Sequence, residues 1–375
     1  MNMNNKNWVS VWGNAVSIAE HHPEAYAKYI TLRYPVYIPF DGDTLRFTFD
    51  NFCGSEAVTV TRATVSAATS PVYEKMPLAC PCKKETICDI TFSKNESVTM
   101  EAHQTAVSDP VSFPVKKGMT LTVSLYFADF TLMQSAVLVT GPLSKGFFSL
   151  GDQTHADALP MDTTKTTNWF YFLSNIELMT AEENHTVICY GDSITAGAWP
   201  DYLTLLARQN PDNHTAFIRR ATSGSRVLRQ YECITYDSYG LKGTNRFPHE
   251  IPTTGADTVI IQQGINDIIH PIGIETNPFR PMSDLPTAKE LIDGYRYYIE
   301  EAKKLHLKVY MGTLLPIFGW RTYATFRDDL RNELNAWIRS AKEIDGCIDF
   351  DLALRGSENP SAFREGFDSG DHLHP

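Results

Sequence analysis

Residues 186–195 read TVICYGDSIT, and this stretch decides how the second half of the chain folds. Its first five residues form an apolar run, which is typical of a strand buried on both faces of a parallel sheet. Similar runs occur at 258–261, 309–313 and 347–350. Between them, apolar residues recur every three or four positions at 291–305 and 326–341, which predicts helices. Strands that alternate with helices predict βαβ units and a doubly wound, mainly parallel α/β sheet.

The first half of the chain has a different pattern. Between residues 29 and 139 the apolar segments are short, alternate with polar residues and are separated by Asp-Gly and Pro. This alternation is typical of half-buried antiparallel strands, and no long helical period accompanies it. We therefore predict an antiparallel β-sandwich over residues 1–180, followed by an α/β domain over residues 184–375. The clearest strands are expected at 30–34, 45–49, 58–61, 98–100, 121–127, 136–139 and 170–173.

The composition limits the class of protein. The 375 residues carry a net charge of −11 and contain no run of Lys or Arg, which disfavours nucleic acid as a partner. No apolar stretch approaches the roughly 18 residues that cross a bilayer, so no membrane association is expected. The N-terminus has no signal-peptide pattern and the seven cysteines are scattered. We expect a cytoplasmic location, or secretion if a signal peptide has been removed, and the oligomeric state stays open.

Ser193 lies just past the carboxyl end of the first predicted parallel strand. Active sites of open α/β sheets form at this edge, and the helical pattern that resumes at 199–206 would place the Ser193 amide near a helix N-terminus. One interpretation is that Ser193 only caps that helix. The other is that Ser193 is a nucleophile, which needs a base.

A candidate base lies at the other end of the chain, where Asp371 and His374 form an Asp-x-x-His pattern. His374 would take the proton of Ser193 and later return it to the leaving group, while Asp371 would fix the imidazole tautomer. His372 would point elsewhere. The alternative interpretation of this segment is a polar surface turn.

Two further loops are expected at the same edge of the sheet, and both carry groups that stabilise an oxyanion. Gly224 follows the strand-like segment 215–219, and Asn266 follows the run at 258–261. The Gly224 backbone N–H and the Asn266 side-chain amide would join the N–H of Ser193 as donors to the developing charge. Each residue taken alone is also compatible with an ordinary turn.

Together these segments resemble the SGNH, or GDSL, hydrolase family: GDSITAG its first block, SG its second, GIND its third and DHLHP its fifth. The resemblance covers about residues 186–375 and implies a flavodoxin-like three-layer domain. It implies Ser193 as the nucleophile, Gly224 and Asn266 as oxyanion donors, and Asp371 with His374 as the base.

Segments of the first half, at 8–12, 45–51 and 107–111, resemble a branch of this family with a jelly-roll-like domain ahead of the hydrolase domain. Members of that branch are mostly carbohydrate esterases, including xylan-esterase-like proteins, or lipase-like hydrolases. The family continues past the His-Pro pair with a helix, whereas this sequence stops at Pro375. We expect reduced activity or stability unless the sandwich or a partner chain holds the tail.

Other candidate groups have simpler interpretations. Cys80, Cys82 and Cys88 lack the paired spacing of a zinc site, so we expect a reduced loop and no metal. Asp192 and Asp267 flank the proposed site, where they would brace their loops or, alternatively, form the carboxylate pair of a glycosidase.

Three residues near the site are candidates for substrate binding: Asp192, Trp199 and Trp320. Trp199 follows Ser193 closely, and Trp320 and its neighbour Phe318 come after the run at 309–313. Aromatic faces suit sugar rings or acyl chains, but loop packing explains these side chains equally well.

The sequence therefore predicts a serine esterase that forms an acyl-Ser193 intermediate and needs no metal or organic cofactor. The resemblance favours a carbohydrate ester, and acetyl is the expected acyl group. A lipase-like esterase, an acyltransferase that uses the same serine, and a carbohydrate-binding protein with a weakly active hydrolase domain are the alternatives.

Overall fold

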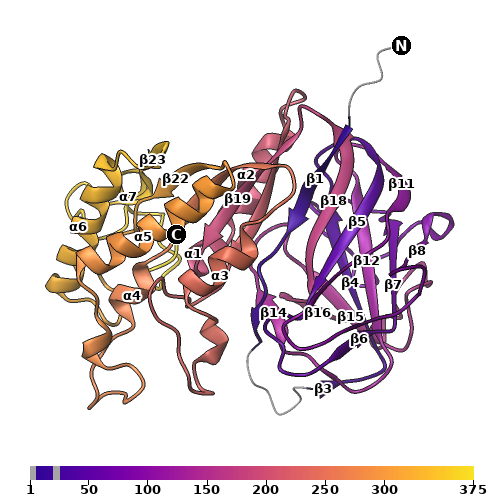
Figure 1. Cartoon of the computed structure of the whole chain (residues 1–375), viewed down its shortest axis with the longest axis horizontal. Helices are drawn as coiled ribbons and strands as arrows, with labels where there is room; N and C mark the ends of the chain where they lie inside the picture. The colour runs from indigo at the N-terminus through magenta and orange to yellow at the C-terminus, as the bar shows by residue number, and fades with distance from the viewer. Residues whose placement is uncertain (1–5, 20–25) are drawn as a thin grey trace. The chain divides into compact units, whose positions relative to one another are not determined.

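A computed structural model of the chain describes residues 6–19 and 26–375 (Figure 1). Its contacts divide the chain into two compact units that interleave along the sequence. Unit 1 comprises the chain up to Val187 together with Ala196–Arg220 and Thr253–Ala256. Unit 2 comprises Ile188–Thr195, Ala221–Pro252 and Asp257–Pro375. The division thus differs from the single boundary between residues 180 and 184 that the sequence suggests, because two short segments of the second half pack with the first.

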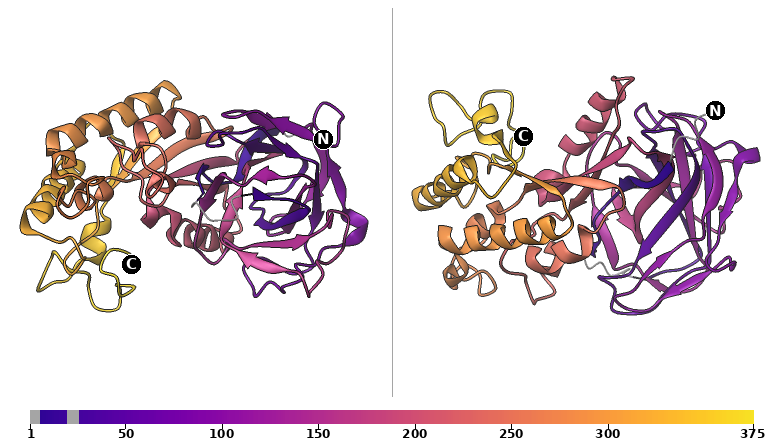
Figure 2. Two further views of the ribbon diagram at one scale, coloured as in Figure 1. Left: turned by 90° about the horizontal axis from the view of Figure 1, so that it is seen from below. Right: turned by 45° about the horizontal axis from the view of Figure 1, so that its top comes forward.

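Two antiparallel sheets make up most of unit 1 (Figure 2). One has the order β1-β18-β5-β10, with β11 also paired to β5; the other has the order β16-β15-β4-β12-β7-β8. The predicted antiparallel architecture is confirmed. The strands of the first sheet are β1 (Lys6–Gly13), β18 (Leu173–Ala181), β5 (Gly42–Asp50), β10 (Thr105–Val107) and β11 (Val111–Val115). Those of the second are β16 (Lys165–Thr167), β15 (Gly146–Leu150), β4 (Ile30–Tyr37), β12 (Thr120–Phe127), β7 (Arg62–Ala67) and β8 (Cys88–Ile90).

Short pairings complete the unit. They are β13 (Thr131–Leu132) with β3 (Tyr26–Ala27), β6 (Val58–Val60) with β9 (Val98–Met100), and β14 (Ser135–Leu138) with both β17 (Trp169–Tyr171) and β2 (Ser17–Ile18). Before residue 187 the described residues contain one short 3₁₀ helix, η1 (Lys84–Thr86), and no α-helix, which agrees with the absence of a helical period there.

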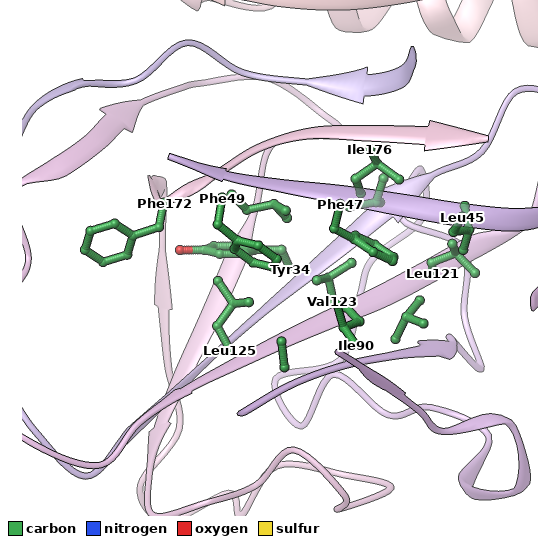
Figure 3. Packing of buried hydrophobic residues seen from close by; sticks show 14 of the residues in the cluster. Tyr34, Leu45, Phe47, Phe49, Ile90, Leu121, Val123, Leu125, Phe172 and Ile176 are labelled. Carbon is green, nitrogen blue, oxygen red and sulfur yellow. The ribbon is translucent and has the colours of Figure 1, made fainter. Parts of the chain in front are cut away.

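The two large sheets share one hydrophobic core (Figure 3). Alternate residues of β5, namely Leu45, Phe47 and Phe49, point into it and are fully buried. Leu121 and Val123 of β12 meet them from the other sheet. This is the arrangement of a β-sandwich, in which every second residue of a strand faces the opposite sheet.

Strand β12 is buried along its whole length, whereas the sequence predicted a half-buried strand there. Its polar residues lie on the outer face, where Arg33 donates to Ser124 Oγ over 2.9 Å. The same guanidinium donates to the carbonyls of Gln153 and Ala156, so a loop covers this face. Alternation in the sequence marks the inner face correctly, but it cannot show that a distant loop buries the outer one.

The second half contains a five-stranded sheet with the order β20-β19-β21-β22-β23. In chain order this is 2-1-3-4-5, the doubly wound order in which a ligand site forms where the strand order reverses. Strand β22 pairs in parallel with both β21 and β23, as predicted. The strands are β19 (His185–Gly191), β20 (Thr215–Ala221), β21 (Ala256–Gln262), β22 (Lys308–Gly312) and β23 (Gly346–Ile348).

The helices of this half are α1 (Ser193–Ala196), α2 (Trp199–Arg208), α3 (Gly243–Glu250), α4 (Ile265–Ile269), α5 (Ala288–Lys304), α6 (Thr325–Ser340) and α7 (Phe350–Leu354). Two 3₁₀ turns, η2 (Asp237–Tyr239) and η3 (Met282–Asp284), lie between them. Helices α5 and α6 confirm the two predicted from apolar spacing. Helix α5 begins with a capping box between Thr287 and Glu290, which satisfies N–H groups of its first turn.

One predicted strand ends earlier than expected. The run at 347–350 predicted a strand through Phe350, but β23 stops at Ile348. The Asp349 side chain accepts the N–H of Leu352 over 3.1 Å, so Asp349 caps α7 and Phe350 is helical. No helix within residues 6–19 and 26–375 is long and apolar enough to cross a membrane.

Replacing Phe47 by Ala should lower the free energy of unfolding by about 3–5 kcal/mol, because it leaves a cavity in the shared core. Urea denaturation of the full chain measures this loss. Phe130→Ala is the matched control: that ring is 69% exposed, so its loss should cost within about 0.5 kcal/mol. Equal effects of the two variants would contradict this description of the core.

Candidate active site

Ser193 is the first residue of α1 and follows directly after β19. The side chain that caps this short helix belongs to its neighbour: Asp192 Oδ1 accepts the N–H of Ile194 over 3.1 Å. Helix α2 begins after Ala198, without any side-chain cap. The interpretation of Ser193 as a helix cap is therefore wrong, and its hydroxyl lies elsewhere.

The Ser193 hydroxyl is hydrogen bonded to His374: Oγ lies 2.9 Å from Nε2. The other ring nitrogen of His374, Nδ1, lies 2.6 Å from Oδ2 of Asp371. In neutral His374 with its proton on Nδ1, Nδ1 donates to Asp371 and Nε2 accepts from Ser193. The three side chains that the sequence singled out at opposite ends of the domain thus form one continuous chain of hydrogen bonds.

A tight turn holds His374 in place. Oδ1 of Asp371 accepts the N–H groups of Leu373 and His374, each over 2.9 Å. Both the N–H and the hydroxyl of Ser369 donate to the carbonyl of His374. The side chain of Leu373 is buried, and its packing anchors the turn. Burial opposes ionisation of Asp371, but its hydrogen bonds from His374 and from the backbone hold its pKa at about 2.

His372 lies away from this pair, as expected. Its Nδ1 is 2.5 Å from Oδ2 of Asp368. The ring lies against the backbone of Gly319, where an added Cβ would be 2.7 Å from His372 Cγ. The loop after β22 therefore contacts the segment that carries His374.

The backbone N–H groups of Ser193 and Gly224 have no hydrogen-bond acceptor within the described residues. Gly224 has a φ of +78°, and a Cβ there would lie 2.4 Å from the ring of Tyr239. Asn266 is buried, and its Nδ2 gives one proton to the carbonyl of Ser225 over 3.1 Å, which leaves a second proton. Each predicted oxyanion donor thus keeps a proton to give. The Asn266 bond also ties the two loops together directly.

A buried polar network that the sequence did not reveal supports these loops. Ser225 Oγ lies 2.7 Å from Nη1 of Arg246 and 2.9 Å from Nε2 of Gln263. Gln263 in turn accepts from two tyrosines of α5, Tyr295 at its carbonyl and Tyr298 at its side chain.

The charge of Arg246 is balanced by Glu250 at 2.9 Å, and both side chains are buried. The sequence indicates this network only through the positions of two residues beside the predicted site loops. Ser225 follows Gly224, and Gln263 precedes Gly264.

Asp192 and Asp267 are both closed to solvent and brace their loops. Asp267 accepts the N–H groups of Val227 and Leu228 over 2.7 and 3.1 Å. Burial raises the pKa of Asp192 to about 7 and that of Asp267 to about 6. The bracing interpretation is confirmed. A glycosidase carboxylate pair, and the assignment of Asp192 to substrate binding, do not fit side chains that present no surface.

The aromatic candidates stay predictions as substrate contacts. Trp199 is the first residue of α2 and belongs to unit 1. Trp320 is half-buried in the loop after β22, with the guanidinium of Arg321 4.6 Å from its ring centre. Phe318, in the same loop, is half-exposed and packs edge-on against Tyr323.

The cysteine loop has a structural environment. Cys80 and Cys82 are buried, Cys88 is half-buried, and none of the three is in a disulfide. The Cys80 carbonyl accepts from the buried guanidinium of Arg33. Among residues 6–19 and 26–375 no group of three His, Cys, Asp or Glu side chains is arranged to hold a metal ion.

Residues 189–375 match the sequence profile of the GDSL-like lipase/acylhydrolase family. This part of the chain belongs to that family. The chain is accordingly an ester-hydrolysing enzyme, and the GDSL domain contains Ser193, Gly224, Asn266, Asp371 and His374. No curated protein matches the chain in sequence.

Solved structures resemble the GDSL domain in fold. A GDSL-like lipase from Bacteroides thetaiotaomicron is 20% identical over 52% of this chain and 80% of its own, with a TM-score of 0.38. An acetyl xylan esterase from Geobacillus stearothermophilus is 17% identical over 52% of this chain and 89% of its own, with a TM-score of 0.37. A further acetyl xylan esterase, AlAXEase, is 22% identical over 50% and 90%, with a TM-score of 0.37.

Asp192→Asn should raise the stability of the GDSL domain above that of wild type, and this gain should be larger at pH 8 than at pH 4. The folded pKa of Asp192, about 7, lies above the unfolded value of about 3.9, so the folded state binds more protons between these pH values. Wild-type stability therefore falls as pH rises through this window, and Asn removes that loss. The difference in free energy of unfolding between Asp192→Asn and wild type should grow by a few kcal/mol with rising pH, at about 1.4 kcal/mol for each unit by which the pKa is raised. Denaturant unfolding at pH 4, 6 and 8 measures this difference.

The matched control is Asp293→Asn. Its carboxylate is exposed, and the hydrogen bond from Lys289 lowers its pKa, so no gain with rising pH is expected. A constant difference between Asp192→Asn and wild type at all three pH values would contradict the raised pKa of Asp192.

Proposed function

We propose that the protein is a serine esterase that works through an acyl-Ser193 intermediate. The observation that carries the proposal is the continuous pair of hydrogen bonds from Ser193 Oγ to His374 Nε2 and from His374 Nδ1 to Asp371. Nucleophile, base and orienting carboxylate in this order are the arrangement that activates a serine hydroxyl for acyl transfer. Membership of the acylhydrolase family agrees with this chemistry.

In the first step, Ser193 Oγ attacks the ester carbonyl carbon while His374 Nε2 takes the hydroxyl proton. The N–H groups of Ser193 and Gly224 and the free amide proton of Asn266 donate to the oxyanion that forms. When the C–O bond to the alcohol breaks, the imidazolium returns its proton to the departing oxygen. Water then attacks the acyl-Ser193 ester with His374 again as base, which releases the acid and restores the serine.

Asp371 has a positioning and an electrostatic role in this scheme. Its hydrogen bond fixes the tautomer in which Nε2 carries a lone pair, and its negative charge stabilises the imidazolium. Because the pKa of Asp371 is about 2, the carboxylate stays ionised at any pH above about 4.

For the substrate we propose an O-acetylated carbohydrate. The sequence resemblance to the branch with a β-rich first domain favours this class, and a short acyl group makes little demand on apolar surface around Ser193. A lipase-like enzyme would instead need an apolar channel for its acyl chain.

Ser193→Ala should abolish hydrolysis of p-nitrophenyl acetate and leave the melting temperature unchanged, because it removes the nucleophile and no structural contact other than the bond to His374. Turnover and labelling by a serine-directed phosphonate, read by intact mass, measure this. Ser340→Ala is the control, since its hydroxyl only bonds carbonyls of its own helix. Labelling that persists in Ser193→Ala would refute the assignment of the nucleophile.

The same assay with acetate, butyrate and octanoate esters tests the acyl group. A fall in kcat/KM with chain length supports a deacetylase. A rise supports a lipase-like enzyme and overturns the acetyl proposal.

Asp371→Asn should lower kcat by a factor of about 10⁴ with little change in KM, because the amide donates to Nδ1 and forces the proton onto Nε2. Steady-state kinetics with p-nitrophenyl acetate separate the two constants. Asp293→Asn again serves as the control, since it removes an exposed carboxylate that pairs with Lys289 and Arg296. A loss below about tenfold would show that Asp371 does not set the tautomer.

A further inference from the structure

A cavity open to solvent lies in unit 2 between two segments that the catalytic scheme does not use. One wall comes from the segment after Gly224 and includes Arg226, Gln230 and Tyr231. The other wall comes from the segment after α4 and includes Phe279 and Asp284. The first strand-to-helix loop contributes nothing to this lining.

The Tyr239 ring links the wall of the cavity to the proposed oxyanion loop. Tyr239 lies against Gly224, so closely that a Cβ on Gly224 would clash with its ring. The Tyr239 ring centre is 5.7 Å from that of Tyr231, which lines the cavity. Arg226 follows Gly224 by two residues, and its charge lies near enough to Asp267 to lower the pKa of that carboxyl against the effect of burial. A ligand in the cavity would therefore be one aromatic ring away from Gly224.

Arg226 lies in the wall of this cavity. Its side chain is 2% exposed, and its Nε has no hydrogen-bond partner within the described residues. Of its other nitrogens, Nη1 binds Asp284 over 3.2 Å, and the guanidinium lies 4.2 Å from the ring centre of Tyr231. Because it is closed to solvent, the guanidinium supports the wall of the cavity, where it contacts Asp284 and the ring of Tyr231.

The lining combines flat apolar faces with polar groups of both kinds. Phe279 is 52% exposed although it is a large apolar side chain, whereas Tyr231, which is 7% exposed, forms part of the wall. Gln230 accepts the N–H of Lys242 at Oε1, which leaves its Nε2 as a donor. Asp284 supplies acceptor oxygens, as does Glu232, a further lining residue.

This combination fits a neutral ring that bears hydroxyl groups. The C–H faces of a sugar pack on aromatic rings, and its hydroxyls both donate and accept, so they pair with Gln230, Glu232 and Asp284. A fatty acyl chain would displace water from these polar groups without replacing its hydrogen bonds, which costs free energy. A carboxylate ligand would meet the charge of Glu232 and would compete with Asp284 for Arg226 and Arg229.

We propose that this cavity is a subsite for a sugar unit of the alcohol part of the substrate, joined to the unit that carries the acyl group. The enzyme then selects acylated oligosaccharides over acylated single sugars. The inference rests on the proposed esterase activity and adds to it the residues that choose the alcohol.

The test compares kcat/KM for mono-O-acetylated xylotetraose and for O-acetylated methyl xyloside, which share the reacting ester and differ in the added sugar units. We expect the wild type to prefer the tetrasaccharide. Phe279→Ala should lower this preference about threefold to tenfold, the size of one lost aromatic contact, mainly through KM. Gln230→Ala should lower it in the same direction.

The control is Phe326→Ala, which removes a ring that is similarly exposed, at 48%, but lies outside the cavity lining. It should keep the wild-type preference. Equal kcat/KM on the two substrates, or a preference that Phe279→Ala leaves intact, would overturn the subsite while leaving the esterase proposal standing. A rise of kcat/KM from acetyl to octanoyl esters that Phe279→Ala abolishes would make the cavity an acyl-chain site and would also overturn it.

A binding measurement keeps the two proposals separate. Calorimetric titration of Ser193→Ala with unacetylated xylotetraose should show binding that the double variant Ser193→Ala/Phe279→Ala weakens. If the wild type hydrolyses neither ester, the esterase proposal fails, and this titration alone decides the subsite. Absence of binding to Ser193→Ala refutes the subsite whether or not the enzyme is active.

Discussion

The hydrogen bond between Ser193 Oγ and His374 Nε2 joins residues 181 positions apart in the sequence, and the proposed chemistry depends on its 2.9 Å length. General-base catalysis needs the two atoms within hydrogen-bond reach, so both ends of the domain must be held with little freedom. The serine end is held by the turn after β19, where Asp192 caps α1. At the histidine end, Asp371 and Ser369 bond the same turn, and Leu373 is buried beneath it.

Buried polar side chains provide the second constraint. Ser225, Gln263 and Arg246 hold the two oxyanion loops through bonds to one another and to the tyrosines of α5. Such groups are costly to bury unless each finds a partner, and a fully paired set fixes one geometry. Helix α5 is thus more than a cover for the sheet, because Tyr295 and Tyr298 reach the strand end that precedes Asn266.

In our proposals, reaction and selectivity are assigned to different segments. The groups that contact the acyl carbon and its oxygen are Ser193, Gly224 and Asn266. They follow the ends of β19, β20 and β21, where the sheet fixes the backbone. The groups that choose the alcohol lie on the segments after Gly224 and after α4, which the sheet does not fix. Such a division lets substrate preference change without disturbing the reaction centre, since loops tolerate substitution better than the ends of buried strands.

The sequence by itself determined the elements whose pattern is local. The apolar runs predicted β19, β21 and β22, the apolar spacing predicted α5 and α6, and the short motifs predicted Ser193, Asp371 and His374 as one group. Local pattern failed where a single side chain or a distant segment decided the outcome. Asp349 ended β23 early, and the 153–156 loop buried the outer face of β12. Asp192 caps α1, and α2, the helix that Ser193 was considered to cap, has no side-chain cap. Only the tertiary structure decided which buried groups brace the site and where the cavity lies. Those features depend on partners far apart in the chain, and their energies come from desolvation and close packing, which no local spacing encodes.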